Sequence, residues 1–590
     1  MKKLIATVTT VLIYCTPHSI QASDTEAMVN VYGRTTTSLN GFWNALPDYI
    51  NSGHYRRVWE EKTPASKTDF YEYSFDGTPK IAVPGDFNSQ LDQMKYSEGT
   101  VWYKHTFNHD ADSRRERTFL YFGAVNYMAE VYLNGELIGQ HEGGFTPFQF
   151  EVTDRLRPGD NTLIVMADNR RRSDGLPGEA FDWFGYGGIT RDVMLVHTPG
   201  TFVDDYFIRL DPEGNICGDI HLDGNPSDVT VSIPELRLKK TIQAGSDSIK
   251  FTTNKKPQRW SPANPKLYHV EIICEGDTIR DRIGFRDIRT DGDKILLNGE
   301  PIFVKAVNIH EETLGNPARA FSREHAIKML SYAKDLGCNM VRLAHYPHNE
   351  HTVRLAEEMG LMVWDEIPVY QSIQFTAPGV EEKIHSMMHE MVRRDKNRCA
   401  VTVWSLSNET WPSTPGRTDV LTPLTGACRQ LDDTRLITHV INTQHYTDNV
   451  MHMNDPLYDA CDLLCINEYV GWYIPWQGEP EQMQWDLPSG KPLFISEFGG
   501  EAKYGSNFGP KDSAGYWSEE FQADIYRKQI RMFDATQNLA GVCPWILFDY
   551  LSLGRMHPVY QGGYNRKGLV DEYGKKKQAY GIMKDYYSRK

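Results

Sequence analysis

The chain has 590 residues, of which 40% are hydrophobic and 24% charged, and its formal net charge is −15. This length exceeds what one hydrophobic core supports, so we expect several domains of ordinary globular composition. The acidic balance, without any run rich in lysine or arginine, argues against a nucleic-acid-binding protein. Beyond the N-terminus no apolar run approaches the roughly 18 residues of a membrane span.

The N-terminal residues have the pattern of a targeting segment. Lys2 and Lys3 precede an apolar stretch over residues 4–14, and Ala22 then offers a small residue for cleavage. This order is typical of a secretory signal peptide, which is too short to span a membrane. We therefore predict a signal peptide over residues 1–22 and a periplasmic or secreted mature protein.

The nine cysteines do not follow a disulfide or zinc pattern. They are scattered along a large chain, and Cys461 and Cys465 lack partners at zinc-ligand spacing. We expect most of them to be buried free thiols.

Two β-rich segments follow the N-terminus. Residues 23–200 contain short strands, and Asn134-Gly135 between apolar residues is a strong hairpin signal. We predict a jelly-roll β-sandwich over 23–200. Residues 201–290 continue with short strands, for example at 229–233 and 268–273, and their number and length favour an immunoglobulin-like β-sandwich.

The pattern changes over residues 291–590, after the hairpin signal Asn298-Gly299. Short apolar runs alternate with amphipathic stretches of helical period, which predicts a (β/α)8 TIM barrel. The expected strands cover 302–309, 339–344, 361–365, 401–408, 436–440, 463–467, 493–497 and 541–548. The expected helices cover 322–335, 352–359, 381–396 and 518–535.

Two of these strands end in a carboxylate. The run VTVWSLS at 401–407 stops at Asn408-Glu409, and PLFIS at 492–496 stops at Glu497. Barrel enzymes place their chemistry at the carboxyl ends of the strands, and these two are the fourth and seventh. A carboxylate pair can serve glycoside hydrolysis, which needs one protonated acid and one ionised group. We predict that Glu409 and Glu497 form such a pair.

Four motifs in order along the barrel resemble those of glycoside hydrolase family 2. They are VRLAHYPH at 341–348, WDEIP at 364–368, WSLSNE at 404–409 and ISEFG at 495–499. The domain order also matches the family, so the resemblance covers nearly all of the mature chain. It implies a retaining, exo-acting β-glycosidase that forms a glycosyl-enzyme and requires neither cofactor nor metal.

The resemblance also implies roles for individual residues. Glu409 would be the general acid/base and Glu497 the nucleophile, while Asn408 would bind the sugar 2-hydroxyl. His310 and His345 are expected to line the sugar site, and Trp545 to form its aromatic floor. We expect Arg342 to pair with an acid, and we assign Asp365 and Glu366 to barrel packing.

The loop after strand eight bears on the identity of the sugar. Asn565-x-Lys567 resembles the motif with which the β-glucuronidases of the family bind a uronate carboxylate, and an ammonium with an amide suits that anion. The region 467–473 is similar to a substrate-binding stretch of these enzymes, which implies roles for Asn467, Tyr469 and Tyr473. Asp182 matches their sandwich-domain aspartate that reaches into the pocket.

Two residues depart from that pattern. Glu468 stands where arginine is usual, and it would repel a uronate if it pointed inward. Gln561 replaces an arginine that is common in glucuronidases. The sequence therefore leaves open a β-galactosidase acting on galactan-derived oligosaccharides. A magnesium-dependent galactosidase is disfavoured because no clear ligand set accompanies Glu409.

A different class of protein is also considered. A non-catalytic carbohydrate-binding protein would be expected to lack one of the two glutamates, and both are present. We expect a carbohydrate substrate, no nucleic-acid partner and no membrane span, with a homo-oligomer compatible with the sequence.

Overall fold

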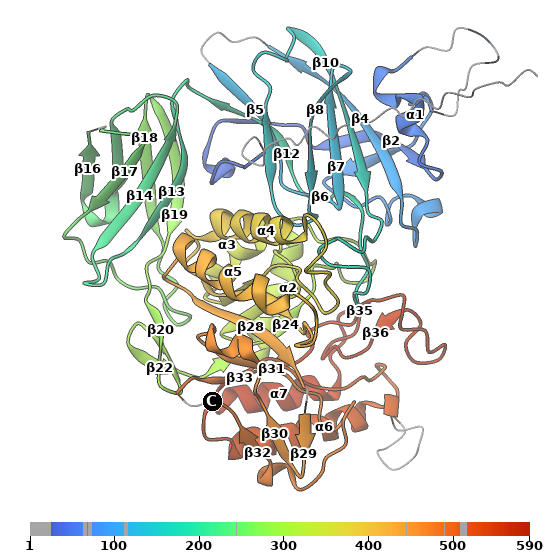
Figure 1. Cartoon of the computed structure of the whole chain (residues 1–590), viewed down its shortest axis with the longest axis vertical. Coiled ribbons are helices and arrows are strands. Elements are labelled where there is room, and N and C mark those ends of the chain that lie inside the picture. Colours follow the sequence, from blue (N-terminus) through green and yellow to red (C-terminus); the bar gives the residue numbers. More distant parts are fainter. Residues whose placement is uncertain are drawn as a thin grey trace, which may run out of the picture.

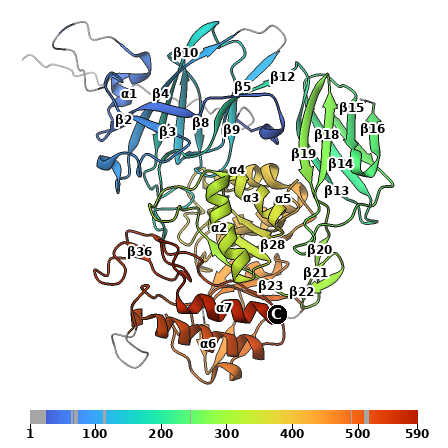
Figure 2. The ribbon, with the colours of Figure 1, turned by 180° about the vertical axis from the view of Figure 1, so that it is seen from behind.

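The computed structural model of the chain describes residues 25–590 apart from 63–65, 67, 69–72, 111–115, 244, 444, 489 and 508–515. The predicted signal peptide therefore lies outside the described residues. Figures 1 and 2 show two β-sandwiches side by side, both packed on a β/α barrel. This arrangement confirms the predicted fold class.

The first sandwich consists of two antiparallel sheets around a buried apolar core. One sheet has the order β1 (Thr36–Ser38), β12 (Val193–Thr198), β5 (Arg117–Phe122) and β9 (Phe148–Glu151). The other has β3 (Lys80–Val83), β2 (Gly41–Asp48), β4 (Thr100–His109), β10 (Gly159–Asp168), β7 (Met128–Leu133) and β8 (Glu136–Glu142). Asn134 and Gly135 have φ of 54° and 88°, so they form the expected tight hairpin between β7 and β8.

The second sandwich also has two sheets. They are β13 (Phe202–Leu210), β14 (Ile216–Asp223) and β17 (Ser248–Thr252), and β16 (Leu238–Ile242), β15 (Val229–Ile233), β18 (Tyr268–Cys274) and β19 (Asp277–Ile283). Buried residues alternate with partly exposed ones along β15 and β18, as expected for strands that bury one face. A small sheet of β20 (Ile288–Asp291), β21 (Lys294–Leu297) and β22 (Glu300–Ile302) leads into the barrel.

The barrel sheet is parallel throughout. Its strands are β23 (Val304–Lys305) with β24 (Asn308–Ile309), β25 (Met340–Leu343), β26 (Met362–Glu366), β27 (Val401–Asn408), β28 (Leu436–Asn442), β31 (Leu464–Asn467), β33 (Leu493–Glu497) and β34 (Leu539–Val542). The predicted first strand is divided, because β23 pairs with β34 while β24 pairs with β25. The two halves together close the barrel, so Glu409 follows the fourth strand and Glu497 ends the seventh.

Helices cover the outside of the barrel. They are α2 (Arg323–Leu336), α3 (Glu350–Met359), α4 (Val380–Asp395), α5 (Arg417–Leu431), α6 (Glu519–Ala535) and α7 (Gln578–Ser588). Ser322 and Ser518 cap α2 and α6 by accepting a backbone N–H, as serine does at an N-cap. Strand β28 is followed by β29 (His445–Thr447) and β30 (Val450–His452), which form a side sheet with β32 (Gln484–Asp486).

The predicted eighth strand is longer than the observed one. The apolar run predicts a strand over 541–548, but β34 ends at Val542. Beyond it the Trp545 N–H donates to the Phe498 carbonyl and the Ile546 N–H to the Lys567 carbonyl. These hydrogen bonds turn the chain over the end of the barrel, which places Trp545 above the sheet.

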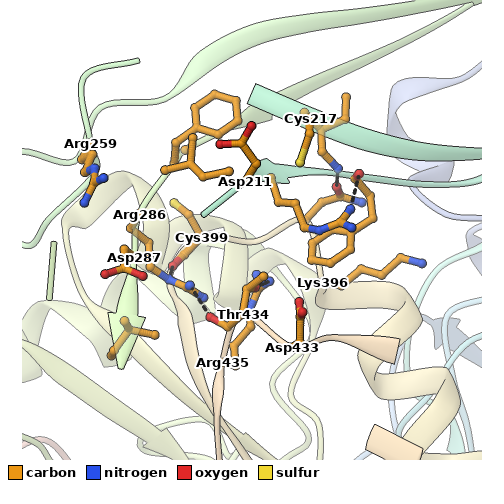
Figure 3. A pocket seen from close by; sticks show the side chains of 18 of the residues that line it. Asp211, Cys217, Arg259, Arg286, Asp287, Lys396, Cys399, Asp433, Thr434 and Arg435 are labelled. Carbon is orange, nitrogen blue, oxygen red and sulfur yellow. Dashed lines mark hydrogen bonds between the residues drawn. The ribbon is translucent and has the colours of Figure 1, made fainter. Parts of the chain in front are cut away.

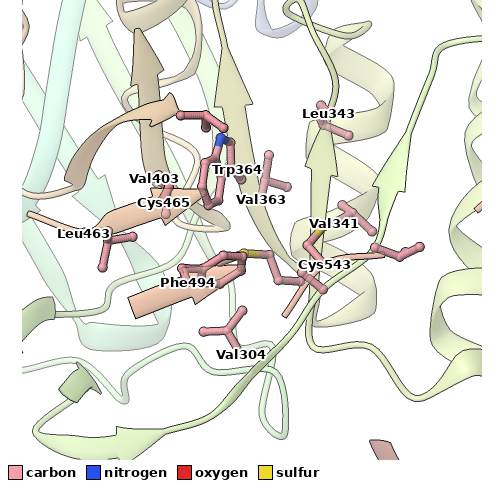
Figure 4. Packing of buried hydrophobic residues seen from close by; sticks show 14 of the residues in the cluster. Val304, Val341, Leu343, Val363, Trp364, Val403, Leu463, Cys465, Phe494 and Cys543 are labelled. Carbon is pink, nitrogen blue, oxygen red and sulfur yellow. The ribbon is translucent and has the colours of Figure 1, made fainter. Parts of the chain in front are cut away.

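Apolar side chains from successive strands fill the barrel interior. Val304, Val341, Val363, Val403 and Phe494 are at most 1% exposed and meet there (Figure 4). The cysteines from Cys217 onward are free thiols, and seven of those eight are buried, as predicted. Within the described residues, no helix is long and apolar enough to cross a membrane.

Buried polar contacts fix the second sandwich to the barrel. Trp260 Nε1 donates to the Glu357 carbonyl at 3.0 Å. Arg398 is 2% exposed and pairs with Asp281 of β19 and, at 3.0 Å, with Glu357 of α3. These contacts hold an acid from each domain against one guanidinium.

Arg398→Ala should destabilise the protein strongly, by roughly 3–5 kcal/mol, because it leaves Glu357 buried without its cation and leaves Asp281 with Arg354 alone. The measurement is the midpoint of denaturant unfolding. The control is Arg280→Ala, whose pair with Glu271 joins side chains 70% and 37% exposed, and it should leave the midpoint near wild type. Equal midpoints for the two variants would contradict the assignment.

Candidate active site

A cavity of about 410 Å³ lies at the carboxyl ends of the barrel strands. Its walls come from a loop of the first sandwich, from the ends of several barrel strands, and from the loop between β35 (Tyr550–Leu551) and β36 (Tyr564–Asn565). The lining residues are Asp182, His345, Tyr370, Gln371, Glu409, Trp411, Asn442, Thr443, Asn467, Tyr469, Tyr473, Ile474, Glu497, Trp545, Arg555, Asn565 and Lys567. The predicted glutamate pair and both predicted carboxylate-binding residues therefore share one cavity.

Glu497 is held in place by charged and polar donors. Arg342 Nη1 donates to its Oε1 at 2.9 Å, and the Tyr469 hydroxyl donates to its Oε2 at 2.7 Å. Burial raises the pKa of the Glu497 carboxyl above its ordinary value, and Arg342 and His345 partly offset that effect. A carboxylate with a cation on one oxygen and a phenol on the other is positioned to act as an anionic nucleophile.

The Arg342 guanidinium links Glu497 to a second buried carboxylate, that of Glu366. It is fully buried and also donates to both carboxylate oxygens of Glu366, at 3.0 and 3.1 Å. Burial opposes ionisation of Glu366, but Arg342 and then His345 outweigh it and hold the pKa of Glu366 at about 2. Glu366, which the sequence pattern assigns to packing, therefore remains ionised and orients both Arg342 and His345. The Nδ1 atom of His345 lies 2.6 Å from Glu366 Oε1.

Glu409 has different partners. Gln371 Nε2 donates to its Oε2 at 2.9 Å and Asn467 Nδ2 to its Oε1 at 3.0 Å, so both donors are neutral amides. Glu409 and Gln371 have φ of 55° and 48°, in the left-handed region that such residues rarely adopt. Strain of this kind gathers at functional sites, where packing enforces it. The two glutamates are therefore supported differently, since a cation and a phenol bind Glu497 whereas two neutral amides bind Glu409.

Asn408 does not line the cavity but is hydrogen-bonded to Asn467, which does. It is 2% exposed, and its Oδ1 accepts from Arg342 Nη2 at 2.8 Å and from Asn467 Nδ2 at 3.1 Å. Its buried Nδ2 has no hydrogen-bond partner among the described residues. An unsatisfied buried amide is costly, so this donor is available for a substrate hydroxyl.

Aromatic rings form one wall of the cavity. Trp545 stacks on His345 with ring centroids 4.7 Å apart, and Tyr370 lies 4.9 Å from His345. Trp183 of the first sandwich packs against Tyr370 at 5.0 Å and so joins the two domains at the site. Flat apolar faces of this kind suit contact with a sugar ring.

His310 does not line the cavity, which corrects the sequence-based expectation. Its ring lies behind the wall, packed on Tyr550 at 4.3 Å and Trp545 at 5.4 Å. Burial, and then His345, lower the pKa of His310 well below its ordinary range, so the ring is neutral. It supports the aromatic wall from behind.

Cations gather at the other end of the cavity. Lys567 Nζ donates to the Tyr473 hydroxyl at 2.8 Å and approaches Glu501 at 3.4 Å. Asn565 is fully buried, and its Nδ2 donates to Asp182 Oδ2 at 3.1 Å. Asp182 also accepts from Ser552 at 2.5 Å and pairs with Arg555. The pKa of Asp182 is lowered, because although burial raises it, the bonds to Arg555 outweigh burial.

Glu468 and Gln561, the two residues that depart from the glucuronidase pattern, do not line the cavity. Glu468 is fully buried, and its Oε2 accepts from the Val470 N–H at 3.0 Å and from Gln529 of α6 at 3.2 Å. Burial raises the pKa of Glu468 to about 7. Gln561 Nε2 donates to Glu501 at 2.9 Å. Neither residue borders the cavity, so Glu468 does not present its charge to a substrate there.

Sequence reasoning missed several residues of the site. Gln371 follows the end of strand three, and Arg555 lies in the loop already linked to carboxylate binding. The strand-end rule that identified the glutamates would have brought Gln371 into consideration. Trp183 carries no signal of its own, because a tryptophan in a sandwich domain is an ordinary core residue.

A second cavity, of about 560 Å³, lies between the second sandwich and the barrel (Figure 3). Several of its charged side chains are engaged in structural contacts. Arg286 donates to the carbonyls of Cys399, Val401 and Thr434. Arg209 pairs with Asp219 at 2.6 Å and Arg435 with Asp432 at 3.1 Å. These contacts indicate a domain junction rather than a reaction site.

Within the described ranges, no group of three or more His, Cys, Asp or Glu side chains is arranged to hold a metal ion. Glycoside hydrolysis by a carboxylate pair runs through the two acids and their hydrogen-bond partners.

A β/α barrel that holds two differently supported carboxylates and an aromatic wall in one cavity defines a glycoside hydrolase. The chain belongs to glycoside hydrolase family 2. Residues 288–587 match the family's TIM barrel domain, 37–199 its sugar binding domain and 201–286 the remaining family 2 domain. The resemblance predicted from the four motifs is thus confirmed.

Similar proteins are found in bacteria. A β-glucuronidase of Streptococcus agalactiae is 27% identical over 571 residues, which cover 86% of this chain and 91% of the relative. The structure of an uncultured Clostridium sp. β-glucuronidase superposes with a TM-score of 0.81 at 25% identity, covering 94% of this chain and 98% of that one. A Faecalibacterium prausnitzii β-glucuronidase has a TM-score of 0.80 at 27% identity, with the same coverage.

Tyr469→Phe should shift the acid side of the pH profile of kcat/KM to higher pH. Burial raises the pKa of Glu497 above its ordinary value, so the ionised form that a nucleophile requires is lost as the pH falls through that raised value. The Tyr469 hydroxyl stabilises the ionised form, and removing it raises the pKa of Glu497 further.

The matched control is Tyr446→Phe, whose hydroxyl bonds Asn449 outside the cavity and whose profile should not move. An unshifted acid limb in Tyr469→Phe would show that the group titrating there is not Glu497.

Proposed function

We propose that the protein is an exo-acting, retaining β-glucuronidase. The observation that carries this proposal is the position of Lys567 and Asn565 in the same cavity as Glu409 and Glu497. A lysine ammonium at one end of the cavity suits the C6 carboxylate of a uronate, and the carboxylate pair acts at the other end on the anomeric carbon. The β-glucuronidases similar to this chain support the same substrate class.

The chemistry follows from the partners of each carboxylate. Glu409 donates its proton to the glycosidic oxygen as the bond to the aglycone breaks, and Glu497 attacks the anomeric carbon to form a glycosyl-enzyme. Glu409, now ionised, takes a proton from water, which attacks the same carbon and releases Glu497. The free Nδ2 of Asn408 donates to the sugar 2-hydroxyl, a contact that strengthens in the transition state.

The shape of the cavity supports exo-attack. Asp182 from the first sandwich and the loop between β35 and β36 wall off the end of the cavity that holds Lys567. Because these contacts join the first sandwich to the loop beside Lys567, we expect only a terminal sugar to place its carboxylate there. The enzyme would therefore remove a terminal residue, which a polysaccharide-derived oligosaccharide or another glycoside would provide.

We also propose that the protein is exported, on the basis of the pattern at residues 1–22. The mass of the mature protein from its native host tests this proposal. A mature chain that retains these residues would contradict it.

Glu497→Ala and Glu409→Ala should each lower turnover by orders of magnitude, because each removes one of the two reacting groups. With a dinitrophenyl glycoside, whose leaving group needs little protonation, Glu409→Ala should recover glycosylation while Glu497→Ala should not. Glu479→Ala, which changes a side chain 68% exposed, is the control. Near-normal turnover by either variant on a substrate with a poor leaving group would contradict the assignment.

The choice of sugar is tested by comparing chromogenic β-glucuronide and β-galactoside. Wild type should prefer the glucuronide, and Lys567→Ala should lose that preference because the carboxylate loses its cation. Glu468→Gln, which alters a buried charge outside the cavity, should keep the preference. A wild-type preference for the galactoside would instead support a β-galactosidase of the same family.

A further inference from the structure

Arg555 lies in the cavity, although no sequence motif assigns it a role. It stands in the loop between β35 and β36, ten residues before Asn565, and its side chain is 25% exposed. Asp182 of the first sandwich accepts from its Nε at 3.1 and 3.2 Å and also pairs with its Nη2. This two-point pairing fixes the plane of the guanidinium and directs Nη1 away from Asp182.

The Arg555 Nη1 atom and Lys567 meet at one oxygen. Nη1 lies 3.2 Å from the Tyr473 hydroxyl, and Lys567 Nζ lies 2.8 Å from the same oxygen. Because both cations donate, the Tyr473 oxygen acts as acceptor for two hydrogen bonds and its own hydrogen points elsewhere. Burial raises the pKa of Tyr473, but Lys567 and then Arg555 outweigh burial, and the pKa is lowered.

Arg555 and Lys567 retain hydrogen-bond donors that are not fully used near Tyr473. Both cations approach the buried Glu501 Oε1 only at 3.4 Å, which is long for a charge-assisted hydrogen bond. An ammonium and a guanidinium therefore converge here, and the Tyr473 hydroxyl keeps a hydrogen that neither cation uses. A carboxylate, which offers two oxygens and accepts from several donors at once, is the group that completes this set.

Gln561 does not supply this cation. It stands where the resemblance expects arginine, but its amide bonds Glu501 at 2.9 Å and it does not border the cavity. Arg555 reaches the cavity from six residues earlier in the same loop.

We propose that Arg555 is a specificity residue that binds the substrate carboxylate together with Lys567 and Tyr473, in place of the arginine absent at position 561. This inference rests on the proposed function. Asp182 holds the guanidinium in its binding orientation before the substrate arrives, so that little freedom is lost on binding.

The test compares steady-state kinetics of Arg555→Gln, Arg555→Lys and Ser552→Ala on aryl β-glucuronide and on the aryl β-glucoside that lacks the carboxylate charge. Arg555→Gln should raise KM for the glucuronide by roughly ten- to hundredfold, the value of one hydrogen bond to a charged group. Its kcat/KM on the glucoside should stay within about threefold of wild type, because that substrate lacks the carboxylate that Arg555 binds.

The other variants show whether Arg555 binds the substrate carboxylate or only holds Asp182 in place. Arg555→Lys keeps the charge and should recover part of the glucuronide affinity. Ser552→Ala removes another donor to Asp182 without changing charge, so it should affect both substrates alike. If Arg555→Gln lowers activity on both substrates equally, Arg555 only positions Asp182 and the inference is overturned.

Failure of the inference and failure of the proposed function are distinguishable. A wild type that prefers glucuronide, with Arg555→Gln unchanged on it, overturns only the role of Arg555. A wild type without that preference overturns the proposed function as well. If Arg555→Gln does not fold, Arg555→Lys decides the matter, because it keeps the charge but loses the planar set of donors. It should raise KM for the glucuronide more than for the glucoside, and an equal effect on both substrates would overturn the inference.

Discussion

One buried guanidinium holds the reacting end of the site together. Arg342 of β25 donates to Asn308 of β24, to Glu366 of β26, to Asn408 of β27 and to Glu497 of β33. A fully buried cation must be matched by acceptors, so these strands must keep their relative positions for Arg342 to be satisfied. The same requirement that stabilises the barrel therefore sets the orientation of Glu497, the proposed nucleophile.

The opposite end of the cavity depends on a contact between domains. Asp182 comes from the first sandwich, whereas Ser552, Arg555 and Asn565, which bind it, come from the loop after strand eight. Trp183, next to Asp182, packs on the aromatic wall of the barrel. Substrate recognition is thus divided between two parts of the chain that are far apart in sequence.

The fold and the position of Glu409 and Glu497 at the ends of barrel strands could be predicted from the sequence because both depend on short-range patterns. Apolar runs of strand length, followed at once by Glu409 or Glu497, locate the ends of barrel strands without knowledge of packing. The divided first strand and the early end of β34 could not be read in this way. They result from hydrogen bonds to residues distant in the sequence, such as Phe498 and Lys567.

The direction of a side chain was also not predictable from the sequence. Glu468 follows the strand-end residue Asn467, yet its carboxylate turns outward to Gln529 of α6. A one-residue shift at the end of a strand reverses the face to which a side chain points, and a loop such as that of Arg555 has no period from which to infer direction.

The contribution of Asp182 has a consequence for how specificity is inherited in such proteins. The carboxylate that orients Arg555 is encoded in the first third of the gene, whereas Glu409 and Glu497 are encoded in the last. Under the proposed function, recombination that exchanged the N-terminal sandwich would leave both glutamates in place and replace a residue that contributes to the choice of sugar. The N-terminal domain would then transfer substrate selectivity separately from the reacting groups of the barrel.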